Sequence, residues 1–79
     1  MPKLREIGRP YENLANAIVR QAAEDYMYAL RRLKHDPKNY SAQRSVWEQE
    51  KFFHSEWYSM LTSADPDYLI RRLREEVES

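Results

Sequence analysis

Six residues between positions 15 and 33 recur at spacings of four, three, four, three and four, which place them on one face of an α-helix. They alternate small and larger side chains: Ala15, Val19, Ala22, Tyr26, Ala29 and Leu33. This is the heptad spacing of a helix that packs against a neighbouring helix along one seam. The alanines permit close approach, and the larger residues fill the space between them. The pattern therefore predicts a long helix with a helical partner.

Four prolines and a single glycine mark where helices begin and end. Gly8 and Pro10 precede the first periodic segment, and Pro10 suits a first helical turn, where no backbone N–H is needed. The stretch "HDPKN" at 35–39 is typical of a turn, because Asp and Asn bond nearby backbone and proline ends the preceding helix. The stretch "SADPD" at 63–67 is a second turn and a helix start, with Asp65 as the N-cap.

The expected organisation is all-α, a small three-helix unit. Helices are predicted near 10–35, 39–62 and 66–78, and no strand is predicted because β-branched residues are sparse and never alternate. Two long helices form an antiparallel pair, and a short C-terminal helix packs beside them. We expect a flexible N-terminal arm over 1–9 and a single helical domain over 10–79. Three i,i+4 ion pairs are expected on the outer surface of the last helix: Arg71–Glu75, Arg72–Glu76 and Arg74–Glu78.

Half of the ten aromatic side chains fall within residues 46–61, "VWEQEKFFHSEWYSML". On a continuous helix, where successive residues lie about 100° apart, this stretch divides into three groups. The group expected to face the core comprises Val46, Phe53, Trp57 and Met60. A second stripe comprises Trp47, His54 and Tyr58, with Lys51 beside it. Phe52 points away from both groups, on a polar outer face that it shares with Glu48 and Glu56.

The second stripe and Phe52 are the candidate binding residues. Trp47 and Tyr58 either cover the third helix or the N-terminal arm, or are partly exposed and bind a partner, as aromatic residues often do at interfaces. A Phe on a polar face is costly for solubility unless something covers it. The candidate covers for Phe52 are a second copy of the chain, a different protein and the N-terminal arm.

No catalytic or cofactor-binding motif is present. The chain has no cysteine, no Ser-His-Asp set and no glycine-rich phosphate loop. Glu50 and His54 are four residues apart, but a metal site needs further ligands and supporting groups. We therefore expect no enzyme, no metal and no cofactor. No apolar run approaches the ~20 residues of a transmembrane helix, and no signal peptide is recognisable, so we expect a cytoplasmic protein without a membrane partner.

The two halves of the chain carry opposite charge. Residues 1–44 hold nine Lys and Arg against five Asp and Glu, a net charge of +4, and residues 45–79 hold four against eight, a net charge of −4. Either the halves attract each other as packed helices, or they present charged surfaces to partners. The candidate nucleic-acid patch comprises Arg31, Arg32, Lys34 and Lys38, with His35 among them. The candidate acidic surface comprises Glu48 and Glu56 around Phe52, followed by Asp65 and Asp67.

Three stretches carry a resemblance to a known group of proteins: "EDYMYALRRLKHDPKN", "FFHSEWYSMLT" and "DPDYLIRRLREEV". The pattern, which covers most of the chain from about Asn16 to Val77, resembles short helical proteins encoded on prophages and conjugative elements of gut Firmicutes. The resemblance implies an accessory protein of a mobile element. Such proteins are often inhibitors of host defence, anti-CRISPR proteins among them, and commonly act by occupying a surface of a large target.

Residues and resemblance together predict a small, non-catalytic protein–protein interaction module. Its most concrete form is an inhibitor of a host defence nuclease, bound to a host protein or nucleoprotein. Two alternatives remain open. One is a small DNA-associated regulator that uses the basic patch, which zero net charge disfavours because phosphate contacts need a basic surface. The other is a structural helical homodimer.

Overall fold

Four helices follow one another along the chain in the computed structural model, which describes the backbone of residues 4–79 and the side chains of residues 10–79. They are α1 (Leu4–His35), α2 (Tyr40–Phe53), α3 (Glu56–Leu61) and α4 (Pro66–Glu78). Within the described residues there is no strand. The all-α class is confirmed, as are the two long helices and the short C-terminal helix.

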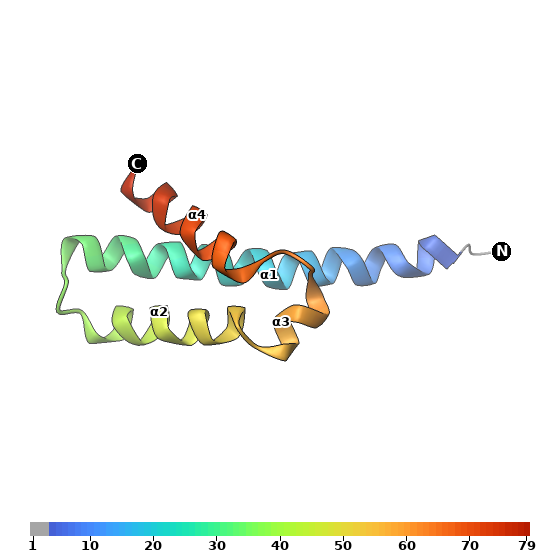
Figure 1. Cartoon of the computed structure of the whole chain (residues 1–79), viewed down its shortest axis with the longest axis horizontal. Coiled ribbons are helices and arrows are strands. Elements are labelled where there is room, and N and C mark those ends of the chain that lie inside the picture. Colours follow the sequence, from blue (N-terminus) through green and yellow to red (C-terminus); the bar gives the residue numbers. More distant parts are fainter. Residues whose placement is uncertain (1–3) are drawn as a thin grey trace.

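The helices α1 and α2 lie antiparallel, and α4 crosses α1 diagonally on its way to the C-terminus (Figure 1). Helix α1 contacts α2, α3 and α4, so it is the common support of the whole unit. The chain is elongated, with principal extents of 55 × 23 × 21 Å. The N-terminal turns of α1 extend past α3, the last element to lie against that end of the helix (Figure 1).

Helix α1 begins earlier than the proline pattern predicted. Its first residue is Leu4 instead of a residue near position 10, and Pro10 lies inside the helix. The expectation that Pro10 occupies a first turn is therefore wrong. A proline inside a helix removes one backbone hydrogen bond, and the helix continues past Pro10 without it. The predicted flexible arm over 1–9 therefore includes helical residues from position 4 onward. Residues 1–3, and the side chains of residues 4–9, lie outside what the structure describes.

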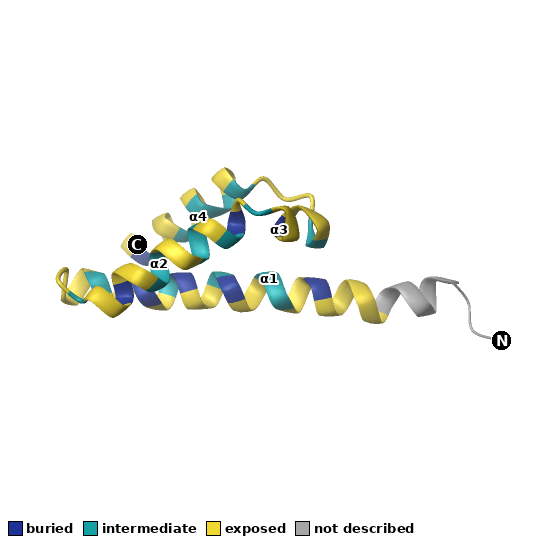
Figure 2. Cartoon of the chain, turned by 90° about the horizontal axis from the view of Figure 1, so that it is seen from below, coloured by how far each residue is buried: buried dark blue, intermediate teal, exposed yellow. Residues whose placement is uncertain are grey.

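The heptad seam of α1 forms the floor of the core. Ala15, Ala22, Tyr26 and Ala29 are all buried, and Figure 2 shows buried positions recurring at intervals along α1 beneath the other helices. The other two members of the seam, Val19 and Leu33, are half-buried. The seam prediction is therefore confirmed.

Four aromatic rings fill the space above this seam. Tyr26 and Phe53 meet edge to face with ring centroids 5.6 Å apart, and Phe53 and Tyr58 meet in the same way at 5.8 Å. Phe52 lies against both Phe53 and Tyr58, at 5.8 and 5.9 Å. Edge-to-face pairs of this kind contribute roughly 0.5–1.5 kcal/mol beyond the area they bury. Helix α4 closes the cluster with Leu69, Ile70 and Leu73.

The predicted continuous helix over 39–62 is wrong, because the chain breaks between α2 and α3. The His54 and Ser55 N–H groups still bond back to Glu50 and Phe52, at 3.2 and 3.0 Å. Ser55 has an extended backbone and is the N-cap of α3, where its hydroxyl accepts a hydrogen bond from the Tyr58 N–H. The same hydroxyl donates to the Phe52 carbonyl at 2.6 Å. One side chain thus ends one helix and begins the next.

The start of α4 agrees with the prediction. Asp65 is the N-cap and accepts a hydrogen bond from the Asp67 N–H at 3.0 Å, with Pro66 in the first turn. The expected ion pairs along the outside of α4 are wrong. Arg72 instead pairs with Glu75, and Arg74 reaches across to Glu50 on α2. Arg74 lies near the inner side of α4, where a partner on another helix is within reach.

Candidate functional site

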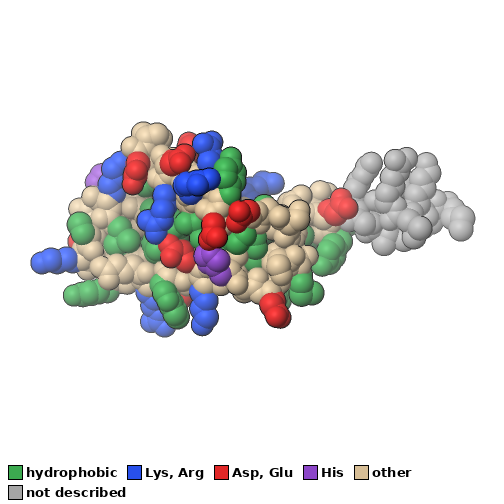
Figure 3. All heavy atoms as spheres, viewed as in Figure 1, with side chains coloured by type: hydrophobic (Ala, Val, Ile, Leu, Met, Phe, Trp, Pro, Cys, Tyr) green, Lys and Arg blue, Asp and Glu red, His purple; other side chains and the backbone are tan. Residues whose placement is uncertain are grey.

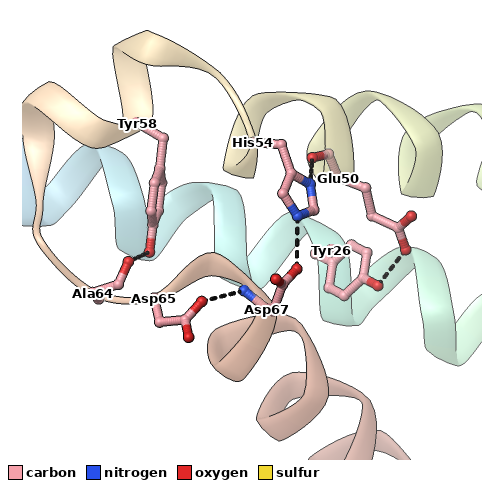
Figure 4. A network of polar contacts seen from close by, with 7 residues as sticks. All are labelled: Tyr26, Glu50, His54, Tyr58, Ala64, Asp65 and Asp67. Atoms are coloured by element: carbon pink, nitrogen blue, oxygen red, sulfur yellow. Dashed lines mark hydrogen bonds and ion pairs between the residues drawn. The ribbon is translucent and has the colours of Figure 1, made fainter.

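A three-residue polar cluster joins α1, α2 and α4. The Tyr26 hydroxyl donates a 2.6 Å hydrogen bond to Glu50 Oε2, as Figure 4 shows, and Arg74 Nη2 donates to the same oxygen at 2.6 Å. The Arg74 guanidinium also lies 5.7 Å from the centroid of the Tyr26 ring. One carboxylate oxygen therefore receives a donor from each of two other helices.

The environment of this cluster sets its charge state. Burial alone would raise the pKa of Glu50, but the hydrogen bonds from Tyr26 and Arg74 favour the ionised carboxylate and hold its pKa below the ordinary value. Burial and the bond to Glu50 raise the pKa of Tyr26, so its hydroxyl stays protonated. The cluster is consequently an ionised acceptor held between two donors, which is an arrangement suited to fixing helices in place.

A second polar connection joins the end of α2 to the start of α4. His54 Nδ1 lies 2.9 Å from the Glu50 carbonyl oxygen, and His54 Nε2 lies 2.9 Å from Asp67 Oδ1 (Figure 4). Both partners are hydrogen-bond acceptors, so the two contacts together favour the doubly protonated, cationic imidazole. The bonds to Asp67 and to the Glu50 backbone raise the pKa of His54.

The predicted site residue Tyr58 is not on the surface. Its ring is buried in the aromatic cluster, and its hydroxyl donates to the Ala64 carbonyl at 3.0 Å, which closes the loop before α4 (Figure 4). Burial raises the pKa of Tyr58. The interpretation of Tyr58 as a partner-binding residue is therefore wrong, because the break at Ser55 turns it inward.

Phe52 is also placed differently from the prediction. It does not stand free on a polar face but is half-buried against Phe53 and Tyr58. Its outer edge contributes to a shallow groove of about 410 Å³ between α1 and α2, where it lies near Ile18 and Ala22. The rest of the chain, rather than a second copy, thus supplies most of the cover for Phe52.

Four large, exposed apolar side chains lie on α3 and the adjoining turns of α1, and Leu14 is placed beside Tyr11 by their i,i+3 spacing. Tyr11 and Trp57, with Met60, line a small hollow of about 120 Å³. The exposed fractions of the four are 61% for Tyr11, 60% for Leu14, 60% for Trp57 and 77% for Met60. We call Tyr11, Leu14, Trp57 and Met60 the α1–α3 patch. Trp57 and Met60 had been predicted to face the core, and that prediction is wrong.

Acidic residues flank the α1–α3 patch. Glu12 follows Tyr11 and Glu56 precedes Trp57, and both glutamates are exposed. Residues 10–19 and 55–65 contain no lysine or arginine. Figure 3 shows green and red side chains over α3 and the adjoining part of α1. The patch is therefore an apolar surface with carboxylates at its border.

The remaining predicted acidic residues have separate roles. Glu48 is half-exposed and pairs with Arg44 at 3.2 Å. Asp65 caps α4 and Asp67 bonds His54, so both carboxylates already have partners within the fold. The predicted acidic surface is therefore divided, and of its members only Glu56 borders the α1–α3 patch.

The predicted basic patch is brought together only in part. Arg31 and Lys34 are three residues apart and lie on one side of α1, whereas Arg32 lies about 100° round the helix from Arg31. Arg32 lies over the Tyr28 ring at 5.7 Å, and Lys34 Nζ donates to the Val77 carbonyl at 3.2 Å. Lys34 consequently ties α1 to the end of α4.

Trp47 lies on the outside of α2, as the surface interpretation required. Its exposed fraction is 61%, and Lys51 Nζ lies 5.0 Å from its ring centroid. Trp47 and Tyr58 therefore do not form one stripe. The two residues belong to different helices, and the break between these helices separates them.

No group of three or more His, Cys, Asp or Glu side chains that would suit a metal ion occurs among the described residues. None of the helices formed by residues 4–79 is both long enough and apolar enough to cross a membrane. Comparisons with protein-family models, with curated proteins and with solved structures found no match.

Sequence reasoning missed the α1–α3 patch, although one signal for it was present. Ser55 followed by Glu56 is a typical helix start, with a capping hydroxyl and an acidic residue in the first turn. A helix start at this point would have separated the face of Trp57 from the face of Phe53. Tyr11 carried no comparable signal, because its exposure depends on how far α3 reaches along α1.

Proposed function

We propose that this chain is a small, non-catalytic binding protein that uses the α1–α3 patch to occupy a surface of a larger protein. The proposal rests on four large apolar side chains, each at least 60% exposed, on α3 and the adjoining turns of α1. Exposed apolar clusters with a polar border are typical of protein interaction sites. Trp57 is the expected anchor, because tryptophan is enriched among the residues that dominate binding energy.

The charge around the patch selects the kind of partner. Glu12 and Glu56 complement a basic surface, and such complementarity raises association rates and disfavours wrong partners. In a symmetric homodimer the patch would meet its own copy, so that carboxylates would face carboxylates. A partner with a basic surface is therefore favoured over a second copy of the chain. The structural homodimer is correspondingly less favoured as the alternative.

The specific form of the proposal is inhibition of a host defence nuclease by a protein from a mobile element. A nuclease must expose a basic groove to hold nucleic acid, and an acidic-bordered apolar patch is suited to block such a groove. The resemblance to proteins of prophages and conjugative elements supports this origin. The mechanism requires no catalytic residue, because occupying the groove is sufficient to exclude the substrate.

Affinity capture from a lysate of a gut Firmicutes bacterium, followed by surface plasmon resonance with the captured protein, tests the proposal. Trp57→Ala is expected to weaken binding by at least ~1 kcal/mol. Glu12→Lys with Glu56→Lys is expected to slow association and flatten its salt dependence. Tyr68→Ala is the matched control, because Tyr68 is an exposed aromatic on α4 outside the patch.

Two results would contradict different parts of the proposal. If Trp57→Ala and Met60→Ala bind the captured protein as the parent does, the α1–α3 patch is not the interface. If the captured protein cleaves no nucleic acid, or cleaves it equally well when saturated with the chain, inhibition of a nuclease is wrong. Binding through the patch would still stand in the second case.

A further inference from the structure

Cationic and aromatic side chains alternate along the outer surface of α2. Tyr40, Arg44, Trp47 and Lys51 recur every three or four residues, a spacing that places them on one face of the helix, and Lys38 precedes them in the turn. All five are exposed. Figure 3 shows the alternation as green and blue side chains along the edge occupied by α2. We call these five residues the α2 strip.

The two aromatic rings of the strip are available for stacking. Tyr40 is 78% exposed and Trp47 is 61% exposed. Neither belongs to the aromatic cluster of the core. Seven residues of helix separate them, which corresponds to about 10 Å along the axis. Large aromatic side chains held this far out of the core stabilise the fold little, so their position favours a role in binding.

The charge of the strip favours an anionic ligand. Among the described residues, Lys38 and Lys51 form no salt bridge, and Lys51 instead lies over the Trp47 ring. Arg44 pairs with Glu48, but both side chains are more than half exposed, and an exposed pair of this kind is readily exchanged for another partner. Two carboxylates lie near the three cations of the strip, namely Glu48 and Asp36, which accepts a hydrogen bond from the Lys38 N–H at 3.3 Å, so the local net charge is +1. This contrasts with the acidic border of the α1–α3 patch.

We propose that the α2 strip binds single-stranded nucleic acid. Bases would stack on Tyr40 and Trp47, and backbone phosphates would contact Lys38, Arg44 and Lys51. Proteins that bind single strands without sequence preference combine aromatic rings, on which bases stack, with cations that contact the phosphates. A duplex is a poorer ligand, because its base faces are already stacked. The α2 strip and the α1–α3 patch are different surfaces, so this inference does not depend on the proposed inhibition of a nuclease.

Fluorescence anisotropy of the full chain with a fluorescein-labelled 15-mer of oligothymidylate tests the inference. Three phosphate contacts on a single strand correspond to a slope of roughly −2 in log affinity against log salt. Affinity should therefore fall about 20-fold between 50 and 200 mM salt. Trp47→Ala should weaken binding at least ~5-fold, and Trp47→Phe should retain most of it, because a ring is still present. Arg44→Ala with Lys51→Ala should reduce the salt slope to about a third of its value.

Two further measurements make the test specific to the strip. In a Trp57→Phe background Trp47 is the only tryptophan, and its fluorescence should be quenched as oligothymidylate stacks on it. Tyr68→Ala is the matched control, because Tyr68 and Arg71 form a similar exposed ring–cation pair on α4. This variant should bind oligothymidylate as the parent does. Circular dichroism of each variant confirms that the helices are intact.

Four results would overturn the inference. They are no binding at 50 mM salt, equal affinity for a duplex of the same length, unchanged affinity in Trp47→Ala, and equally tight binding of a polyglutamate peptide. Equal affinity for a duplex, or unchanged affinity in Trp47→Ala, would indicate that charge attracts the nucleic acid without stacking of its bases. The polyglutamate result would indicate a site for acidic protein segments.

Discussion

The hydroxyl of Ser55 accepts a hydrogen bond from the N–H of Tyr58, and this contact turns the chain between α2 and α3. Because of the turn, Tyr58 enters the core beside Phe53, while Trp57 is left on the surface. On a straight helix Phe53 and Trp57 would share one face. A single capping residue therefore separates the aromatics that hold the fold together from those available for binding.

Replacing Ser55 with alanine is expected to destabilise the protein by about 1 kcal/mol, the usual cost of losing an N-cap side chain. Urea denaturation measures the effect. Ser63→Ala is the control, since Ser63 is exposed in the loop before α4. Ser55→Asp should restore much of the loss, because aspartate is also a good N-cap. Equal stability of Ser55→Ala and the parent would show that the α2–α3 break does not depend on this cap.

Ala22 lies at the centre of the seam, so Ala22→Leu is expected to overpack the contact between α1 and the core. The expected cost is roughly 1–3 kcal/mol, measured by thermal or urea denaturation. Ala17→Leu on the exposed side of the same helix is the matched control and should leave stability nearly unchanged. If both substitutions have the same effect, the close approach at Ala22 is refuted.

Glu50 is expected to make the stability of the protein sensitive to acid. Its pKa is lowered in the folded state, so its contribution is fully present above the ordinary value of 4.5 and is lost as the pH falls through the lowered pKa. Glu50→Gln should reduce stability by about 1 kcal/mol at pH 7. This difference from the parent should shrink as the pH falls below 4.5 and through the lowered pKa. Urea denaturation at a series of pH values is the measurement, and a difference independent of pH would contradict the ionised acceptor.

Tyr26→Phe is a companion variant that keeps the ring but removes the donor to Glu50. The pKa of Glu50 should rise, because one of the hydrogen bonds that favours its ionised form is lost. NMR titration of the Glu50 side chain measures the change. An unchanged pKa in Tyr26→Phe would show that Arg74 alone sets the charge of Glu50.

His54 is expected to give the opposite pH dependence. Its pKa is raised in the folded state, so its contribution is fully present below the ordinary value of 6.5 and is lost as the pH rises through the raised pKa. His54→Gln should therefore lower the melting temperature relative to the parent at pH 5.5, and by less at pH 8.5. Asp67→Asn removes the carboxylate partner of His54, so it should likewise lower the melting temperature more at pH 5.5 than at pH 8.5. A larger effect of His54→Gln at pH 8.5 would contradict the cationic imidazole.

The presence of helices could be predicted from the sequence, because the patterns that indicate a helix involve residues close together in the chain. The seam of α1 and the Asp65 cap of α4 each depend on residues within a few turns of one another, and both are found where they were expected. Helix ends were less predictable. Pro10 was interpreted as a helix start, yet α1 begins at Leu4.

The candidate surfaces could be predicted only in part. Trp47 is exposed as proposed, because it lies on α2 about 120° round the helix from the buried Phe53. Phe52 and Tyr58 were misplaced because their positions depend on a bend that a periodicity argument does not contain. The interaction of Arg74 with Glu50 was also missed, since local pairing along α4 was the only pairing that the sequence pattern could indicate.

The helical class, the turns at 35–39 and 63–67 and the buried face of α1 could all be read from the sequence, since each follows from the spacing and type of neighbouring residues. The tertiary structure decided which aromatics are core and which are surface. That choice depends on how α3 is turned relative to α2 and where α3 stops along α1. Burial is a property of contacts between segments distant in the chain, so Trp57 and Tyr58 end in environments opposite to those that their helical spacing predicted.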